Sequence, residues 1–127
     1  GKELAKMGHK VTFLVAKGSY CDFASVIYLD TQKTLSSQIP ISTDVVHFHI
    51  NPSEPIDKPY IVTIHGNCND FREFDTNSVF VSKNHANRLG SNSFVHNGLD
   101  WEDYGRPNLS SKRNYFHQNL YCYIVYL

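Results

Sequence analysis

The chain has 127 residues, 41% of them hydrophobic and 19% charged, and its twelve basic and twelve acidic residues give a formal net charge of +0. This length allows one domain with its own core, because folding then removes roughly two-thirds of the unfolded chain's surface from water. The balanced charge argues against a nucleic-acid-binding protein, which would carry a basic patch. Three cysteines without C-x-x-C spacing indicate neither a disulfide framework nor a thiolate zinc site, and no apolar run approaches the roughly 18 residues of a membrane span. We therefore expect a cytoplasmic protein.

The first seven residues predict the last turns of a helix. Gly8 follows them and supplies the left-handed residue that ends helices, and Lys6 near the end suits the helix dipole. A helix that begins at residue 1 without an N-cap is shorter than usual. We therefore expect a preceding strand and the first half of this helix to be absent from the chain.

Short, continuous apolar runs follow and predict six strands. They do not alternate cleanly between apolar and polar residues, which is typical of parallel strands covered on both faces. Between them, short helices are predicted over 31–38, over Asp70–Glu73 and from a Ser82 cap over Lys83–Leu89 up to Gly90. The pattern predicts an open α/β sheet of the Rossmann type, parallel, with helices on both faces. The predicted strands are 11–15, 24–29, 45–50, 60–64, 79–81 and 94–95.

One connection in this arrangement is unusually short. Residues 51–59 join two predicted strands and contain Pro52, Pro55 and Pro59, which is too few residues and too much proline for a normal crossover helix. We expect an irregular extended strap here.

Small and polar residues follow nearly every predicted strand. In an open parallel sheet these positions lie along one edge, where α/β folds bind ligands. The edge would suit a small polar ligand that is phosphorylated or hydroxylated. Turn chemistry alone also enriches Gly, Asn and Ser after strands, and the sequence does not decide between the two interpretations. The segments are Gly18-Ser19, Asp30-Thr31, His49–Asn51, His65–Asn67, Ser82 and His96–Gly98.

Three histidines are candidates for ligand binding at this edge of the predicted sheet. On a strand over 45–50, His47 and His49 share one face, with Val46, Phe48 and Ile50 on the other. H-x-H with a third histidine, His65, is also how some barrel hydrolases hold zinc, but no Asp or Glu follows at ligand spacing. We favour a structural role for His47.

The sequence gives little support for a cysteine or serine nucleophile. Cys68 lies near His65 in the sequence, but no third residue is evident to orient such a pair. Ser82 is better explained as a helix cap, since no G-x-S-x-G elbow, P-loop or G-x-G-x-x-G is present.

The order of several motifs resembles the N-terminal domain of GT-B glycosyltransferases of family four, also called group one. Each segment alone is weakly specific, but the order and spacing agree over residues 4–107, which is most of the chain. The segments are L-A-K-M-G-H-K-V-T-F-L-V over 4–15, D-V-V-H-F-H over 44–49, P-Y-I-V-T-I-H-G over 59–66, F-V-S-K over 80–83, F-V-H-N-G-L-D over 94–100 and Arg106-Pro107.

The resemblance implies a retaining transfer of a sugar from a nucleotide-sugar donor to an acceptor, across a cleft between two Rossmann-like domains. This domain would mainly hold the acceptor, whose identity the sequence does not give, and neither a metal, a further cofactor nor a nucleic acid is implied. His65 would be the catalytic residue that contacts the donor sugar or its phosphate. The remaining residues would bind substrate (His49, Asn51, Gly66, Asn67 and Ser82) or form the interdomain hinge (Asn97, Gly98 and Asp100).

The chain departs from the family at both ends. The family's first strand with its glycine-rich loop and the whole C-terminal domain, including the E-x7-E segment, are missing. We therefore expect a partial acceptor-side domain over 1–97, a linker over 98–111 and an unrelated tail over 112–127. Such a fragment would be inactive alone, and the intact enzyme would be cytoplasmic or peripheral to a membrane.

A second hypothesis is a non-catalytic α/β binding or interaction module. The segment over 120–127 is aromatic, β-branched and uncharged, so it would promote self-association if exposed. It could instead fold back as one more strand, and the sequence leaves both alternatives open. A histidine-ligated metal hydrolase is the third hypothesis.

Overall fold

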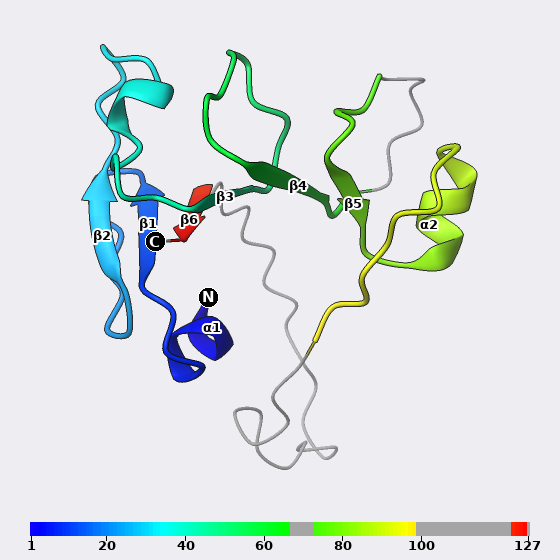
Figure 1. Ribbon diagram of the computed structural model, residues 1–127, viewed down its shortest axis with the longest axis horizontal. Helices are drawn as coiled ribbons and strands as arrows, with labels where there is room; N and C mark the ends of the chain where they lie inside the picture. The colour runs from blue at the N-terminus through cyan, green and yellow to red at the C-terminus, as the bar shows by residue number, and fades with distance from the viewer. Residues whose placement is uncertain (67–72, 99–122, 127) are drawn as a thin grey trace, which may run out of the picture.

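The computed structural model describes residues 1–66, 73–98 and 123–126. Strands dominate the described part of the chain, and its helices are few and short (Figure 1). In chain order the elements are α1 (Lys2–Lys6), β1 (Val11–Val15), β2 (Ser25–Tyr28), the 3-10 turn η1 (Ser36–Gln38), β3 (Val45–Phe48), β4 (Tyr60–Ile64), β5 (Ser78–Phe80), α2 (Lys83–Arg88) and β6 (Tyr123–Tyr126).

Five of these strands form two parallel sets. One set is β2-β1 and the other is β3-β4-β5, and within each set neighbouring strands pair in parallel. Between the sets lies β6, which pairs antiparallel with both β1 and β3, so that the order is β2-β1-β6-β3-β4-β5 (Figure 1). The prediction of an α/β fold with parallel strands is confirmed, and the tail does fold back as a strand.

The core lies on one face of the sheet. Leu14, Val46, Phe48 and Val62 are fully buried there, and Ala86 brings α2 against the same cluster. Alternating residues of β3 and β4 therefore enter the core, and the residues between them face the other way. At roughly 1.5–3 kcal/mol for each large apolar side chain, burial on this face is the main force that holds β3 to β5 under α2.

Both predicted helix ends on glycine are confirmed. Gly8 has φ 91° and follows Met7, the C-cap of α1, and Gly90 has φ 73° and follows Leu89, the C-cap of α2. Only glycine adopts such a conformation without strain, so both glycines stop their helices.

Several predicted elements are shorter than expected, and the strand predicted over 24–29 spans only Ser25–Tyr28. The strand predicted over 45–50 ends at Phe48, and Ile50, two residues before Pro52, is 40% exposed. The strand predicted over 94–95 is reduced to one parallel bridge between Phe94 and Phe80. The helix predicted over 31–38 is only the η1 turn, and the one predicted over Asp70–Glu73 lies largely outside the described residues.

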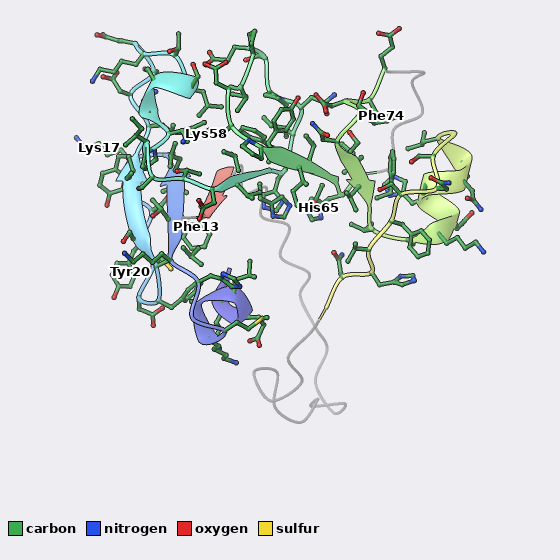
Figure 2. All side chains as sticks on the ribbon, in the orientation of Figure 1. Phe13, Lys17, Tyr20, Lys58, His65 and Phe74 are labelled. Atoms are coloured by element: carbon green, nitrogen blue, oxygen red, sulfur yellow. The ribbon has the colours of Figure 1, made fainter. Side chains whose placement is uncertain are left out.

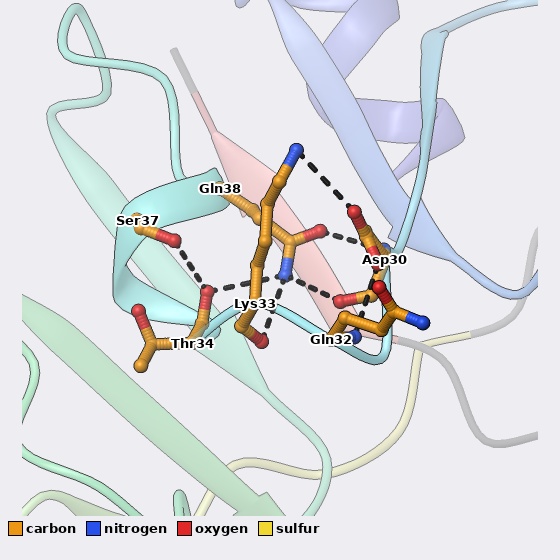
Figure 3. A network of polar contacts seen from close by, with 6 residues as sticks. All are labelled: Asp30, Gln32, Lys33, Thr34, Ser37 and Gln38. Atoms are coloured by element: carbon orange, nitrogen blue, oxygen red, sulfur yellow. Dashed lines mark hydrogen bonds and ion pairs between the residues drawn. The ribbon is translucent and has the colours of Figure 1, made fainter.

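The Gln38 side chain explains why no helix forms after β2. Its Oε1 accepts the backbone N–H of Asp30 at 2.7 Å, and its Nε2 donates to the carbonyl oxygens of Asp30 and Thr34, both at 3.1 Å (Figure 3). The Asp30 carboxylate accepts the backbone N–H of Gln32 at 3.0 Å and pairs with Lys33 at 3.3 Å. These side-chain bonds to the backbone compete with helical ones and fold residues 30–38 into a compact loop.

The proline-containing link between β3 and β4 is an irregular strap, as predicted. No helix occurs in it, and β3 and β4 are parallel neighbours on either side. Glu54 ties the strap to η1 by accepting the backbone N–H of Ser36 at 2.7 Å, and Lys58 donates to the carbonyl oxygen of Ile41. In the described part of the chain, no helix is long and apolar enough to cross a membrane.

Candidate functional site

The carboxyl ends of β3, β4 and β5 lie along one edge, because these three strands are parallel. His49 follows β3, His65 follows β4 and Ser82 follows β5 at this edge. In open α/β sheets ligands bind outside the carboxyl ends of the strands. The candidate site is therefore built around His49 and His65, which the structure brings into contact.

The two histidines reach each other because of strand alternation and register. His47 and His49 point away from the core, since Val46 and Phe48 between and beside them are fully buried. His47 pairs with Ile61 and Phe48 with Val62, which sets the end of β4 beside the end of β3. The sequence prediction that His47 and His49 share a face is thus confirmed.

A hydrogen bond joins the two rings of the site. Nδ1 of His49 lies 2.7 Å from Nε2 of His65, and the ring centroids are 4.9 Å apart. Figure 2 labels His65, which lies beside the end of β4. One of these nitrogens must donate and the other accept, so the two rings cannot both be protonated without losing the bond. In either tautomer of the neutral pair, the two remaining nitrogens are one N–H donor and one acceptor. With one added proton, both become donors and the pair carries a positive charge.

His47 is the third ring in this row and has its own partner. Its Nε2 lies 2.6 Å from Oγ1 of Thr63, and its ring is tilted by 37° against that of His49, with the ring centroids 4.6 Å apart. The structural role predicted for His47 agrees with this contact. Thr63 was not among the predicted site residues, although it lies two positions before His65 and so shares its face.

The row of imidazoles resists protonation. Burial lowers the pKa of His47 from 6.5 to about 4, and the neighbouring His49 and His65 add to the effect when charged. Burial first and His65 second lower the pKa of His49, and burial lowers that of His65. The rings are therefore neutral at pH 7 and are available as hydrogen-bond donors and acceptors.

The described residues do not assemble a metal site. Among residues 1–66, 73–98 and 123–126, no group of three or more His, Cys, Asp or Glu side chains is placed to hold a metal ion. The metal-hydrolase hypothesis depends on such a group. Cys68, which lies near His65 in the sequence, is outside the described residues.

Ser82 acts as a helix cap. Its side chain accepts the backbone N–H of His85 at 3.1 Å, with the extended backbone that an N-cap requires. This confirms the structural explanation of Ser82. A role in binding substrate stays a prediction.

The other predicted residues are spread around the same edge. Asn51 and Gly66 are exposed beside His49 and His65, and Gly66 has open space around its Cα. Asn97 and Gly98 are exposed beyond the Phe80–Phe94 bridge. Asn67 and Asp100 lie outside the described residues.

Comparison of the chain with protein-family models, curated proteins and solved structures gave no match. The site is therefore interpreted from its own geometry and from the motifs in its sequence.

Proposed function

We propose that this chain is the acceptor-side part of a retaining glycosyltransferase of the GT-B type, and that the His49–His65 pair contacts the diphosphate or sugar of a nucleotide-sugar donor. The observation that carries the proposal is the 2.7 Å contact between His49 and His65 at the carboxyl edge of two adjacent parallel strands. Further support comes from the ordered motifs over 4–107.

The chemistry of the pair suits this role. When a glycosidic bond to a nucleoside diphosphate breaks, negative charge develops on the leaving phosphate, and a positioned N–H donor stabilises it. The neutral pair offers one such donor, and the singly protonated pair offers two together with a positive charge. An approaching diphosphate therefore favours uptake of a proton by the pair, which increases its stabilising effect on the leaving group.

In this proposal the domain works with a second, nucleotide-binding domain, and it is inactive by itself. Incubated with a panel of radiolabelled nucleotide sugars and simple acceptors, the chain is expected to give no transfer above background. Turnover by the chain alone would contradict this part of the proposal.

Binding tests the role of the histidines separately. We expect UDP and inorganic pyrophosphate to bind the chain in the millimolar range, and His65→Ala to weaken this binding by about tenfold, the effect of one charge-assisted hydrogen bond. His9→Ala is the matched control, because His9 is exposed at the opposite, amino end of β1. Isothermal titration calorimetry measures both, and equal affinities for His65→Ala and His9→Ala would rule out the proposed contact.

The non-catalytic module remains a second candidate, favoured by one observation. The β6 strand completes the sheet by pairing with strands of both parallel sets.

A further inference from the structure

Asparagines differ in how readily they lose their side-chain amide, because the reaction needs the backbone nitrogen of the next residue. The described part of the chain contains six asparagines, and Asn97 alone among these six precedes a glycine. Without a Cβ, glycine lets other atoms approach its backbone closely and leaves the chain free to change its dihedral angles. The six are Asn51, Asn77, Asn84, Asn87, Asn92 and Asn97.

The structure leaves the Asn97-Gly98 pair accessible. Both residues are exposed, and they lie outside helices and strands in the segment that follows α2, drawn in yellow in Figure 1. The N–H of Gly98 donates to none of the residues that the structure describes. A Cβ placed on Gly98 would meet nothing within 4 Å, so the space around this residue is open. The Gly98 nitrogen can therefore reach the Asn97 side chain without breaking any of the described contacts.

Two asparagines outside the helices precede a serine whose N–H is engaged. Ser78 follows Asn77, is buried at the start of β5 and donates its N–H to the carbonyl oxygen of Asp75 at 2.9 Å. The residue after Asn92 donates its N–H to Oγ of Ser91 at 3.1 Å. Asn77 is the better comparison for Asn97, because both the bond and the burial of Ser78 hold the attacking nitrogen in place.

The remaining three described asparagines are fixed by their backbone. Asn84 and Asn87 lie in α2, and the helix would have to open before either side chain could reach the next nitrogen. Asn51 precedes Pro52, whose nitrogen carries no hydrogen. Sequence and structure thus single out Asn97 within the described part of the chain.

We propose that Asn97 is a site of spontaneous deamidation, with the Gly98 nitrogen as nucleophile and water as the second reactant. The bond from this nitrogen to Cγ of Asn97 forms and the bond from Cγ to Nδ2 breaks. The side-chain nitrogen leaves as ammonia with the proton from the Gly98 N–H, and a five-membered succinimide remains. Water then adds to one of its two carbonyl carbons and opens the ring, which gives aspartate or isoaspartate without any oxidation or reduction.

The product carries a new carboxylate at the edge of the sheet that holds the candidate site. Phe94 forms a parallel bridge with Phe80, and Val95 donates its N–H to the Phe80 carbonyl oxygen at 2.8 Å. Residues 96–98 therefore follow the carboxyl end of β5, as His65 follows that of β4. Because a neutral amide becomes a carboxylate, the formal net charge changes from +0 by one negative unit. This chemistry does not depend on the proposed function.

Peptide mapping by mass spectrometry tests the proposal on the whole chain. Folded chain and chain unfolded in guanidinium chloride are kept at the same pH and temperature, and the conversion of Asn97 and Asn77 is followed over time. Unfolding removes the structure but keeps the sequence, so the ratio of folded to unfolded rates isolates the effect of the fold.

We expect Asn97 to react in the folded chain within about threefold of its unfolded rate. Asn77 is expected to react at least about tenfold more slowly in the folded chain, because Ser78 must first lose its hydrogen bond and its burial. A larger slowing of Asn97 by the fold overturns the proposal, and so do equal ratios at Asn97 and Asn77.

The Gly98→Ala variant tests the nucleophile. Gly98 has open space for a Cβ and no positive φ, so alanine fits the folded backbone, but its methyl group crowds the attacking nitrogen. We expect the rate at Asn97 to fall at least about tenfold and the acidic form seen by isoelectric focusing to accumulate correspondingly more slowly, while the rate at Asn77 stays the same. An unchanged rate at Asn97 in this variant overturns the assignment.

Discussion

His49 and His65 respond to protons as one unit, because a single hydrogen bond links Nδ1 of one to Nε2 of the other. The sequence could predict that His49 and His65 each follow a strand and that His49 shares a face with His47. It could not predict their contact, since this depends on the register of β3 against β4 across the irregular strap. The Thr63 contact with His47 was open to prediction from the alternation of Thr63 and His65, and it was missed.

The low pKa of His47 makes stability depend on pH. Between its value of about 4 in the folded chain and 6.5 in the unfolded chain, the unfolded state binds more protons, so the free energy of unfolding decreases as pH falls through this interval. The half-exposed position of His47 reduces the full effect of the shift, and we expect a loss of about 1–2 kcal/mol from this residue.

Urea unfolding at pH 7 and pH 4.5 measures this loss. His47→Gln retains a hydrogen-bonding side chain toward Thr63 but does not titrate. In this variant we expect the free energy of unfolding to change less between pH 7 and pH 4.5. The same pH dependence in His47→Gln as in the unsubstituted chain would argue against His47 as its source.

Among the elements, α2 matched its prediction because its signals are local. Ser82 caps the start, Gly90 ends the helix and Ala86 enters the core. The region over 31–38 did not match, because the bonds of Gln38 to backbone groups of the loop cannot be read from a helical pattern. Local sequence signals thus predicted where α2 begins and ends. The conformation of residues 31–38 depends instead on side-chain hydrogen bonds to the backbone.

Ser82→Ala is expected to destabilise the chain by about 1 kcal/mol, because the N–H of His85 loses its acceptor. Ser82→Asp, which retains an oxygen acceptor, should restore most of the loss. Thermal unfolding followed by circular dichroism measures both. If Ser82→Asp were as unstable as Ser82→Ala, capping would not explain the effect.

Gln38→Ala is expected to cost about 1–3 kcal/mol, because it leaves the N–H of Asp30 without its acceptor and removes the bonds that Nε2 donates to the carbonyl oxygens of Asp30, Lys33 and Thr34. Ser37→Ala is the matched control, since Ser37 makes one exposed bond to the Thr34 carbonyl oxygen at 2.8 Å (Figure 3). Equal losses in the two variants, measured by urea unfolding, would show that Gln38 does not organise the loop.

For the whole molecule, the parallel sets were predictable and the centre of the sheet was not. Continuous apolar runs gave the strands over 11–15 and 60–64 with the bounds observed. The pairing of β6 with β1 and β3 joins segments that are far apart in the sequence. Local hydrophobic patterns predict strands but not which strands pair, so they could not predict this arrangement. The two alternatives for the tail could therefore be stated from the sequence but not decided.

The direct test of the proposed function is an NMR titration of the His49 and His65 side chains from pH 8 to pH 4, with and without saturating UDP. The proposal predicts that UDP raises the pKa of the pair, because a diphosphate stabilises the proton that the two rings share. The same titration curve for the pair with and without UDP would contradict a donor-contacting role for His49 and His65.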